Sequence, residues 1–150
     1  MDKILVTKFG GTSVGHAEAM QQVALQIKAA RQEWSRLVIV VSAVSGVTDL
    51  LLSGANLASI GNEKGAYETA KELNDKHQNI IKDLLQSSTE KQFVEDRLDT
   101  HIKKFSSLCR AIYVLGEASP RALDAISSLG ERIVVNILAA RLRELECDAK

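Results

Sequence analysis

Two hydrophobic patterns alternate in the first part of this 150-residue chain. Ile4–Val6 and Leu37–Val41 are short unbroken apolar runs, rich in β-branched residues. Both predict strands, and the second run is typical of a strand buried on both faces, as in a parallel sheet. Between them, apolar residues recur at helical spacing, which predicts an amphipathic helix over about 15–33. This order predicts a βαβ unit with a right-handed crossover.

From about residue 50 to 115 the spacing becomes helical throughout. Two apolar stripes consist of Ala66, Ala70, Leu73, His77, Ile80 and Leu84, and of Val94, Leu98, Ile102, Phe105, Cys109 and Ile112. They predict two long helices that form a hairpin on the rim of the sheet, with Thr89 as N-cap of the second. His77 and His101 have core spacing, so we interpret both as structural histidines.

The last third of the chain continues in the helical pattern. Ser119-Pro120 is typical of an N-cap followed by the first residue of a helix. The segment 131–145 could be a helix or a strand, and its length favours a helix. The sequence then stops where an α/β pattern would begin its next strand. Because two strands are fewer than a typical sheet carries, we expect a truncated α/β polypeptide.

Composition narrows the class of protein. Lysine plus arginine and aspartate plus glutamate both number 19, so no basic surface for nucleic acid is indicated. Cys109 and Cys147 lack the spacing of metal ligands, and buried free thiols in a reducing compartment are the simpler interpretation. The sequence shows neither a signal peptide nor an apolar stretch that could span a membrane. We therefore expect a cytoplasmic protein that binds neither nucleic acid nor membranes.

The segment Lys8–Val14 directly follows the first predicted strand and predicts a phosphate site. Gly10 and Gly11 let the backbone turn and approach a ligand, and successive N–H groups in such a turn bind anions. Lys8 adds a full positive charge, and Thr12 and Ser13 are suited to cap the following helix. The lysine precedes the glycines, unlike in a P-loop, and the glycine spacing differs from the dinucleotide fingerprint. The alternative is a simple connection between strand and helix.

A second polar loop, residues 42–49, follows the second predicted strand. Ligands of open α/β sheets bind at the carboxyl ends of the strands. Both loops are at such ends, so we expect them to converge on one site.

Three segments resemble the aspartokinases of the amino-acid kinase superfamily. They are Lys8–Gly15, Val40–Ala43 together with Gly46–Asp49, and Leu129–Arg132. The likeness is collinear over nearly all of the chain. It implies a three-layer αβα sandwich with a mainly parallel sheet, incomplete in this chain, and a helical hairpin insertion. Residues 1–150 would be the amino-terminal portion of the catalytic domain, without its nucleotide half and without regulatory ACT domains.

The resemblance also implies a role for each matched residue. Lys8 would be catalytic and would bind the β- and γ-phosphates of ATP, to which Gly10 and Gly11 would offer backbone N–H groups. Ser42 would lie beside the transferred group. Thr48 and Glu131 would bind the substrate, with Glu131 facing its ammonium group. Without the other motifs, we would instead interpret Glu131 as an acid favoured by the dipole at a helix start.

The implied reaction converts ATP and L-aspartate to ADP and 4-phospho-L-aspartate, the first step toward lysine, threonine and methionine. ATP and Mg²⁺ would be the cofactors, no residue here is assigned to a metal, and we expect a homo-oligomer. The 150 residues alone are expected to be inactive. Two alternatives remain: a sister kinase acting on glutamate, N-acetylglutamate or carbamate, and a non-catalytic phosphate-binding module.

Overall fold

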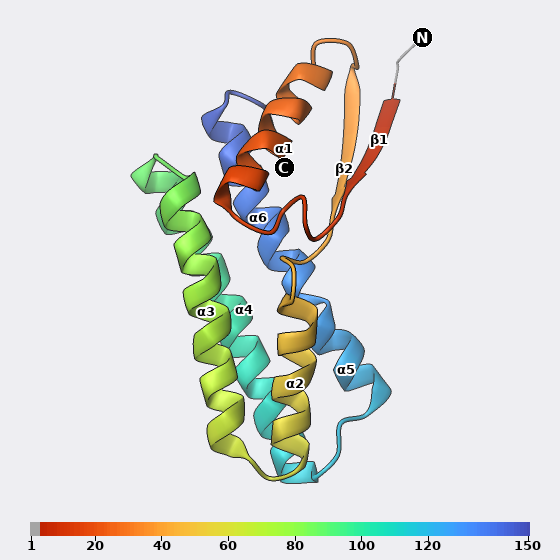
Figure 1. The fold of residues 1–150 in the computed structure, drawn as a ribbon, viewed down its shortest axis with the longest axis vertical. Helices are drawn as coiled ribbons and strands as arrows, with labels where there is room; N and C mark the ends of the chain where they lie inside the picture. Colours follow the sequence, from red (N-terminus) through yellow and green to blue (C-terminus); the bar gives the residue numbers. More distant parts are fainter. Residues whose placement is uncertain (1–3) are drawn as a thin grey trace.

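The computed structural model describes residues 4–150 and begins with the expected βαβ unit (Figure 1). Strands β1 (Ile4–Phe9) and β2 (Arg36–Val41) pair in parallel, with Lys8 opposite Val40. Helix α1 (Ala17–Ala30) connects them. It is shorter than the predicted 15–33, because residues 10–16 form turns before it begins.

Only one face of the sheet is covered by the residues that the structure describes. Phe9, Leu37 and Ile39 pack against the core, on the side where α1 and α6 lie in Figure 1. On the other face the register partners Val6 and Val38 are 65% and 50% exposed. Burial of both strand faces is therefore wrong for residues 4–150, which form two of the three expected layers.

The helical segment extends away from the sheet along the long axis of the molecule (Figure 1). Its elements are α2 (Val47–Ser59), α3 (Glu63–Leu84), α4 (Ser88–Leu115), α5 (Pro120–Ser127) and α6 (Leu129–Glu144). The predicted hairpin of α3 and α4 is confirmed, and so is the helix over 131–145. The hairpin does not pack on the rim of the sheet, however; it packs mainly on α2 and α6.

A glycine explains how the hairpin fits against α2. A Cβ on Gly54 would lie 2.6 Å from Phe105 Cζ and 2.8 Å from Thr69 Cγ2. Phe105 comes from α4 and Thr69 from α3, and both are buried. The missing side chain thus lets three helices meet, which makes α2 the centre of the helical segment.

Two helix caps differ from the sequence expectation. His16, and neither Thr12 nor Ser13, caps α1: its Nδ1 accepts a hydrogen bond from Ala19 N–H at 3.3 Å. Ser87, not Thr89, caps α4 by accepting from Glu90 N–H at 3.3 Å. In both cases several adjacent residues could accept the capping hydrogen bond. Local composition therefore did not determine the residue at which the helix begins.

The Ser119-Pro120 start of α5 is confirmed. Ser119 Oγ accepts from Ala122 N–H at 3.3 Å, and Pro120 is the first helical residue.

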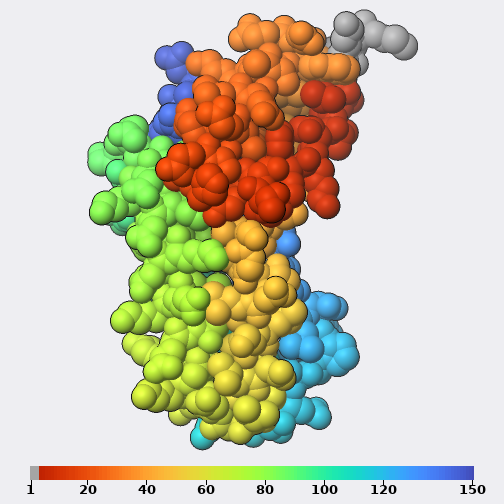
Figure 2. All heavy atoms as spheres, in the orientation of Figure 1, coloured from red at the N-terminus to blue at the C-terminus, as the bar shows by residue number. Residues whose placement is uncertain are grey.

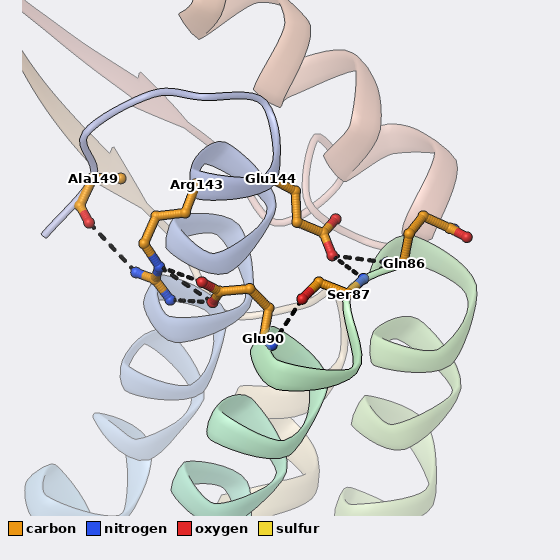
Figure 3. Close-up of polar contacts among 6 residues, drawn as sticks. All are labelled: Gln86, Ser87, Glu90, Arg143, Glu144 and Ala149. Carbon is orange, nitrogen blue, oxygen red and sulfur yellow. Dashed lines mark hydrogen bonds and ion pairs between the residues drawn. The ribbon is translucent and has the colours of Figure 1, made fainter.

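A polar cluster ties the end of α6 to the turn between α3 and α4 (Figure 3). The Glu144 carboxylate accepts from Gln86 N–H at 2.8 Å and from Ser87 N–H at 2.7 Å. Arg143 pairs with Glu90 at 2.6 Å. Burial would raise the pKa of Glu144, but hydrogen bonds from Ser87, Arg141 and Gln86 outweigh it and lower that pKa. The cluster fixes α6 relative to the hairpin.

His77 is a structural histidine, as its spacing predicts. Its side chain is fully buried, and Nδ1 lies 2.7 Å from the Leu73 carbonyl oxygen, to which Nδ1–H donates. Nε2 is buried without a hydrogen-bond partner in the described part of the chain. Burial lowers the pKa of His77, and the nearby Lys76 charge acts in the same direction.

This environment predicts that stability falls as pH decreases below about 6.5, the usual pKa of an unfolded histidine. Between that pH and the lower pKa of folded His77, the unfolded state binds more protons, so acid favours unfolding. Urea unfolding at pH 7.5, 6.5 and 5.5 measures the effect, and His77→Phe should weaken it. Burial also lowers the pKa of the partly exposed His101, so His101→Gln is the matched comparison with a smaller effect. Equal pH dependence in His77→Phe and the parent would contradict the assignment.

The sequence also predicted two buried free thiols and no segment that could span a membrane. Cys109 is buried, and burial raises its pKa to about 11. Cys147 follows α6 and is only half-buried, which corrects its prediction as a buried thiol. In residues 4–150, no helix is long and apolar enough to cross a membrane.

Candidate phosphate-binding site at the strand ends

The first two predicted loops lie side by side at the carboxyl ends of the strands (Figure 1). Ser42 N–H donates to the Phe9 carbonyl at 3.1 Å, which continues the strand pairing into the second loop. Figure 2 shows one flank of the molecule indented beneath the red amino-terminal segment, where it meets the gold start of α2. The two loops therefore form one surface at the end of the sheet where ligands of α/β proteins bind.

Gly10 and Gly11 have different surroundings. A Cβ on Gly11 would lie 3.0 Å from the Ala43 carbonyl oxygen and 3.6 Å from Ser45 N, so its missing side chain lets the loops touch. A Cβ on Gly10 would have nothing within 4 Å. The first loop is closed by a hydrogen bond from Ser13 N–H to the Gly10 carbonyl at 3.0 Å. Gly11 thus packs against the second loop, and Gly10 faces open space where a ligand can approach.

The third motif joins the same site through Gly130. A Cβ there would lie 2.7 Å from Ala43 Cβ and 3.1 Å from Val47 Cγ1. Helix α6 therefore begins against the second loop, and half-buried Glu131 lies in its first turn. The first and third motifs, more than 110 residues apart, both lie against Ala43. The predicted convergence of the first two loops is thus confirmed, and the third motif joins them.

The second loop leads into α2 through a glycine in the left-handed region. Gly46 has φ +78° and is the N-cap of α2, without a side-chain capping bond. Val47 N–H donates to the Val44 carbonyl at 2.9 Å and closes the turn. Thr48 is half-buried in the first turn of α2. Both predicted substrate residues, Thr48 and Glu131, are thus on helix starts that adjoin this loop.

Lys8 lies at the end of β1 that adjoins the first loop. It is exposed and alternates with Ile4 and Val6 on the uncovered face, near the end of β1. Among residues 4–150 its ammonium has no ion-pair partner. Lys8 therefore supplies an uncompensated positive charge two residues before Gly10, where the first loop begins.

The structure adds a residue that sequence reasoning missed. Lys76 Nζ of α3 donates to the Ser45 carbonyl at 3.0 Å. Lys76 is 31 positions from Ser45, so no local pattern could indicate the contact. The spacing of the charged residues along α3 indicates only a solvent-exposed face.

Magnesium has no ready set of ligands in this part of the protein. Within residues 4–150, no three His, Cys, Asp or Glu side chains are grouped so that they could hold a metal ion. We assign none of these residues to Mg²⁺.

The fold and the site together define an α/β protein that presents a glycine-lined surface, with an exposed lysine nearby, at the ends of parallel strands. The model of the amino acid kinase family matches residues 3–150. The chain belongs to that family.

Several aspartokinases are similar to the chain over nearly its whole length. It is 32% identical to bifunctional aspartokinase/homoserine dehydrogenase 1 of Arabidopsis thaliana, over 97% of the chain and 16% of that protein. It is 32% identical to aspartokinase 1 of the same plant, over 97% of the chain and 24% of the relative. The crystal structure of E. coli aspartokinase III with aspartate and ADP superimposes with a TM-score of 0.78 at 25% identity, covering 96% of this chain and 30% of that one. The chain thus spans between about a sixth and a third of these proteins.

Proposed function

We propose that this chain is part of an aspartokinase, which transfers the γ-phosphoryl group of ATP to the side-chain carboxylate of L-aspartate. The observation that carries the proposal is the meeting of all three motifs around Ala43, through Gly11 and Gly130. The similarity to aspartokinases supports it, and the structural neighbour was solved with aspartate and ADP. We infer from the resemblance that residues 1–150 are the amino-terminal portion of the catalytic domain.

The first loop and Lys8 suit the phosphates of a nucleotide. Gly10 faces open space, so its backbone can approach a phosphate oxygen without interference from a side chain. Gly11 would offer its N–H beside it, and Ser42 starts the adjoining loop. The Lys8 ammonium would neutralise charge on the β- and γ-phosphates as the phosphoryl group moves.

The second loop and the start of α6 suit the amino acid. Glu131 would pair with the α-ammonium of aspartate, and the Thr48 hydroxyl would donate to one of its carboxylates. The reacting carboxylate has an ordinary pKa of about 3.9 and is ionised at neutral pH, so no general base is required. Its oxygen forms a bond to the γ-phosphorus while the bond from phosphorus to the β,γ-bridging oxygen breaks, giving 4-phospho-L-aspartate and ADP.

The proposal extends to the metabolic step, the compartment, the use of magnesium and the oligomeric state. The reaction would be the first step toward lysine, threonine and methionine, in the cytoplasm, and it would use the magnesium complex of ATP. We also expect the whole protein to be a homo-oligomer. The oligomeric state stays a prediction.

Trapping with hydroxylamine tests the proposed function directly. The full-length protein is incubated with Mg²⁺-ATP, hydroxylamine and one acceptor acid, and the acyl phosphate is measured as its hydroxamate. Product from L-aspartate, but not from L-glutamate or N-acetyl-L-glutamate, is expected. Carbamate is tested separately by release of ADP. Preference for another acceptor would indicate a sister kinase, and no product with any acceptor would indicate a phosphate-binding module.

Glu131→Gln is expected to raise the KM for aspartate about tenfold to a hundredfold, because it removes a charge-assisted pair with the ammonium group. The KM for ATP should change little. Glu117→Gln, an exposed acid between α4 and α5, is the matched control and should leave both constants unchanged. Initial rates at varied aspartate and varied ATP separate the two effects. A change confined to the KM for ATP would contradict the assigned role.

A further inference from the structure

The second loop lacks the side-chain support that helix starts usually have. Its residues 42–46 lead into α2, whose N-cap Gly46 offers no capping side chain. The loop nevertheless contacts both neighbouring motifs, because Gly11 lies against the Ala43 carbonyl oxygen and Gly130 lies against the Ala43 side chain. Small movements of the loop would therefore disturb the phosphate side and the amino-acid side of the site together.

Lys76 supplies the missing support from outside. Its ammonium donates to the Ser45 carbonyl at 3.0 Å, and a Cβ on Gly46 would lie 3.8 Å from the same Nζ. Lys76 is only half-buried, so its remaining N–H groups can be hydrated. A hydrogen bond from a charged donor is stronger than one between neutral groups. The contact thus holds the peptide that directly precedes the left-handed residue.

The helix that carries Lys76 is itself firmly placed. Helix α3 packs along α2 and α4, and Figure 2 shows it in green against the gold α2. The next residue, His77, is fully buried, and the turn after α3 is bound by Glu144 (Figure 3). A lysine on such a scaffold can fix a loop, because its own backbone does not move with the loop.

We propose that Lys76 is a positioning residue, which holds the second loop in the conformation that packs against Gly11 and Gly130. It does not touch the reacting groups. According to this proposal the helical hairpin not only forms part of the core but also positions a loop of the site. Its effect on catalysis rests on the proposed function, whereas its effect on the loop does not.

Three variants of the full-length protein test the proposal. Lys76→Met keeps the aliphatic stem but removes the donor, Lys76→Arg keeps a charged donor, and Lys71→Met removes an exposed lysine elsewhere on α3. Hydrogen exchange of amides 44–48 should become about tenfold faster in Lys76→Met, the size expected for the loss of one charge-assisted hydrogen bond. The kcat/KM for ATP should fall by a similar factor. Lys76→Arg should restore most of both, and Lys71→Met should match the parent.

The two measurements separate the possible failures. Unchanged exchange of amides 44–48 in Lys76→Met would overturn the proposal, and so would faster exchange spread evenly over all helices, which would indicate a general loss of stability. Faster loop exchange without any change in kcat/KM would overturn the positioning role. If the parent forms no acyl phosphate, the proposed function fails, and exchange in the loop still decides whether Lys76 holds it.

Discussion

Replacing Lys8 with alanine is expected to lower kcat about a thousandfold, with little change in the free energy of unfolding. Removal of one group that stabilises transition-state charge typically costs about 10²–10³ in kcat, and Lys8 carries a full charge rather than a dipole. Its side chain is exposed and has no ion-pair partner among residues 4–150. Folding should therefore not depend on it. Initial rates of hydroxamate formation and urea unfolding measure the two quantities.

Arg36→Ala is the matched control for Lys8→Ala. Arg36 is an exposed cation on the same face of the sheet, at the opposite end of the strands, where it pairs in register with Ile4. If Lys8 acted only through the overall charge of this face, both variants would lose activity alike. We expect the loss in Lys8→Ala alone. Retention of parental kcat in Lys8→Ala would exclude the role given to this lysine.

Substitution by alanine is expected to affect the two adjacent glycines, Gly10 and Gly11, differently. Gly11→Ala places a Cβ 3.0 Å from the backbone oxygen of Ala43, and a backbone cannot move aside as a flexible side chain can. We expect a loss of about 1–3 kcal/mol in the free energy of unfolding, as for other overpacked sites. The loops must separate to admit the methyl group, so activity should fall as well.

Gly10→Ala should behave in the opposite way. The new methyl group meets nothing within 4 Å, and the φ of Gly10 is outside the left-handed region. Stability should be unchanged or higher by about 0.4–1 kcal/mol, because alanine restricts the unfolded chain. The methyl group would nevertheless occupy the approach of a phosphate, so the KM for ATP should rise about tenfold or more.

Thermal unfolding and nucleotide kinetics of both variants give the comparison. Equal losses of stability in Gly10→Ala and Gly11→Ala would show that both glycines serve the turn alone. A normal KM for ATP in Gly10→Ala would show that phosphates do not approach this side of the loop. Either result would contradict the site as we have built it.

Local patterns in the sequence were sufficient to predict most elements. The apolar run at Leu37–Val41 predicted β2, and the stripes that include Leu73 and Phe105 predicted α3 and α4. The motif at Lys8–Val14 and the loop after β2 were predicted to lie together at the carboxyl ends of the strands. These predictions succeeded because strand ends in a parallel pair must lie together, whatever the rest of the fold does.

The sequence by itself determined which face of each long helix is apolar and which short segments could bind phosphate. Only the tertiary structure decided what each face meets: the hairpin packs on α2 rather than on the sheet rim, Gly130 meets Ala43, and Lys76 reaches Ser45. The physical reason is that periodicity records how a side chain is oriented on its own helix or strand. Contacts between residues 31 or more positions apart depend instead on shape and packing, which no local pattern contains.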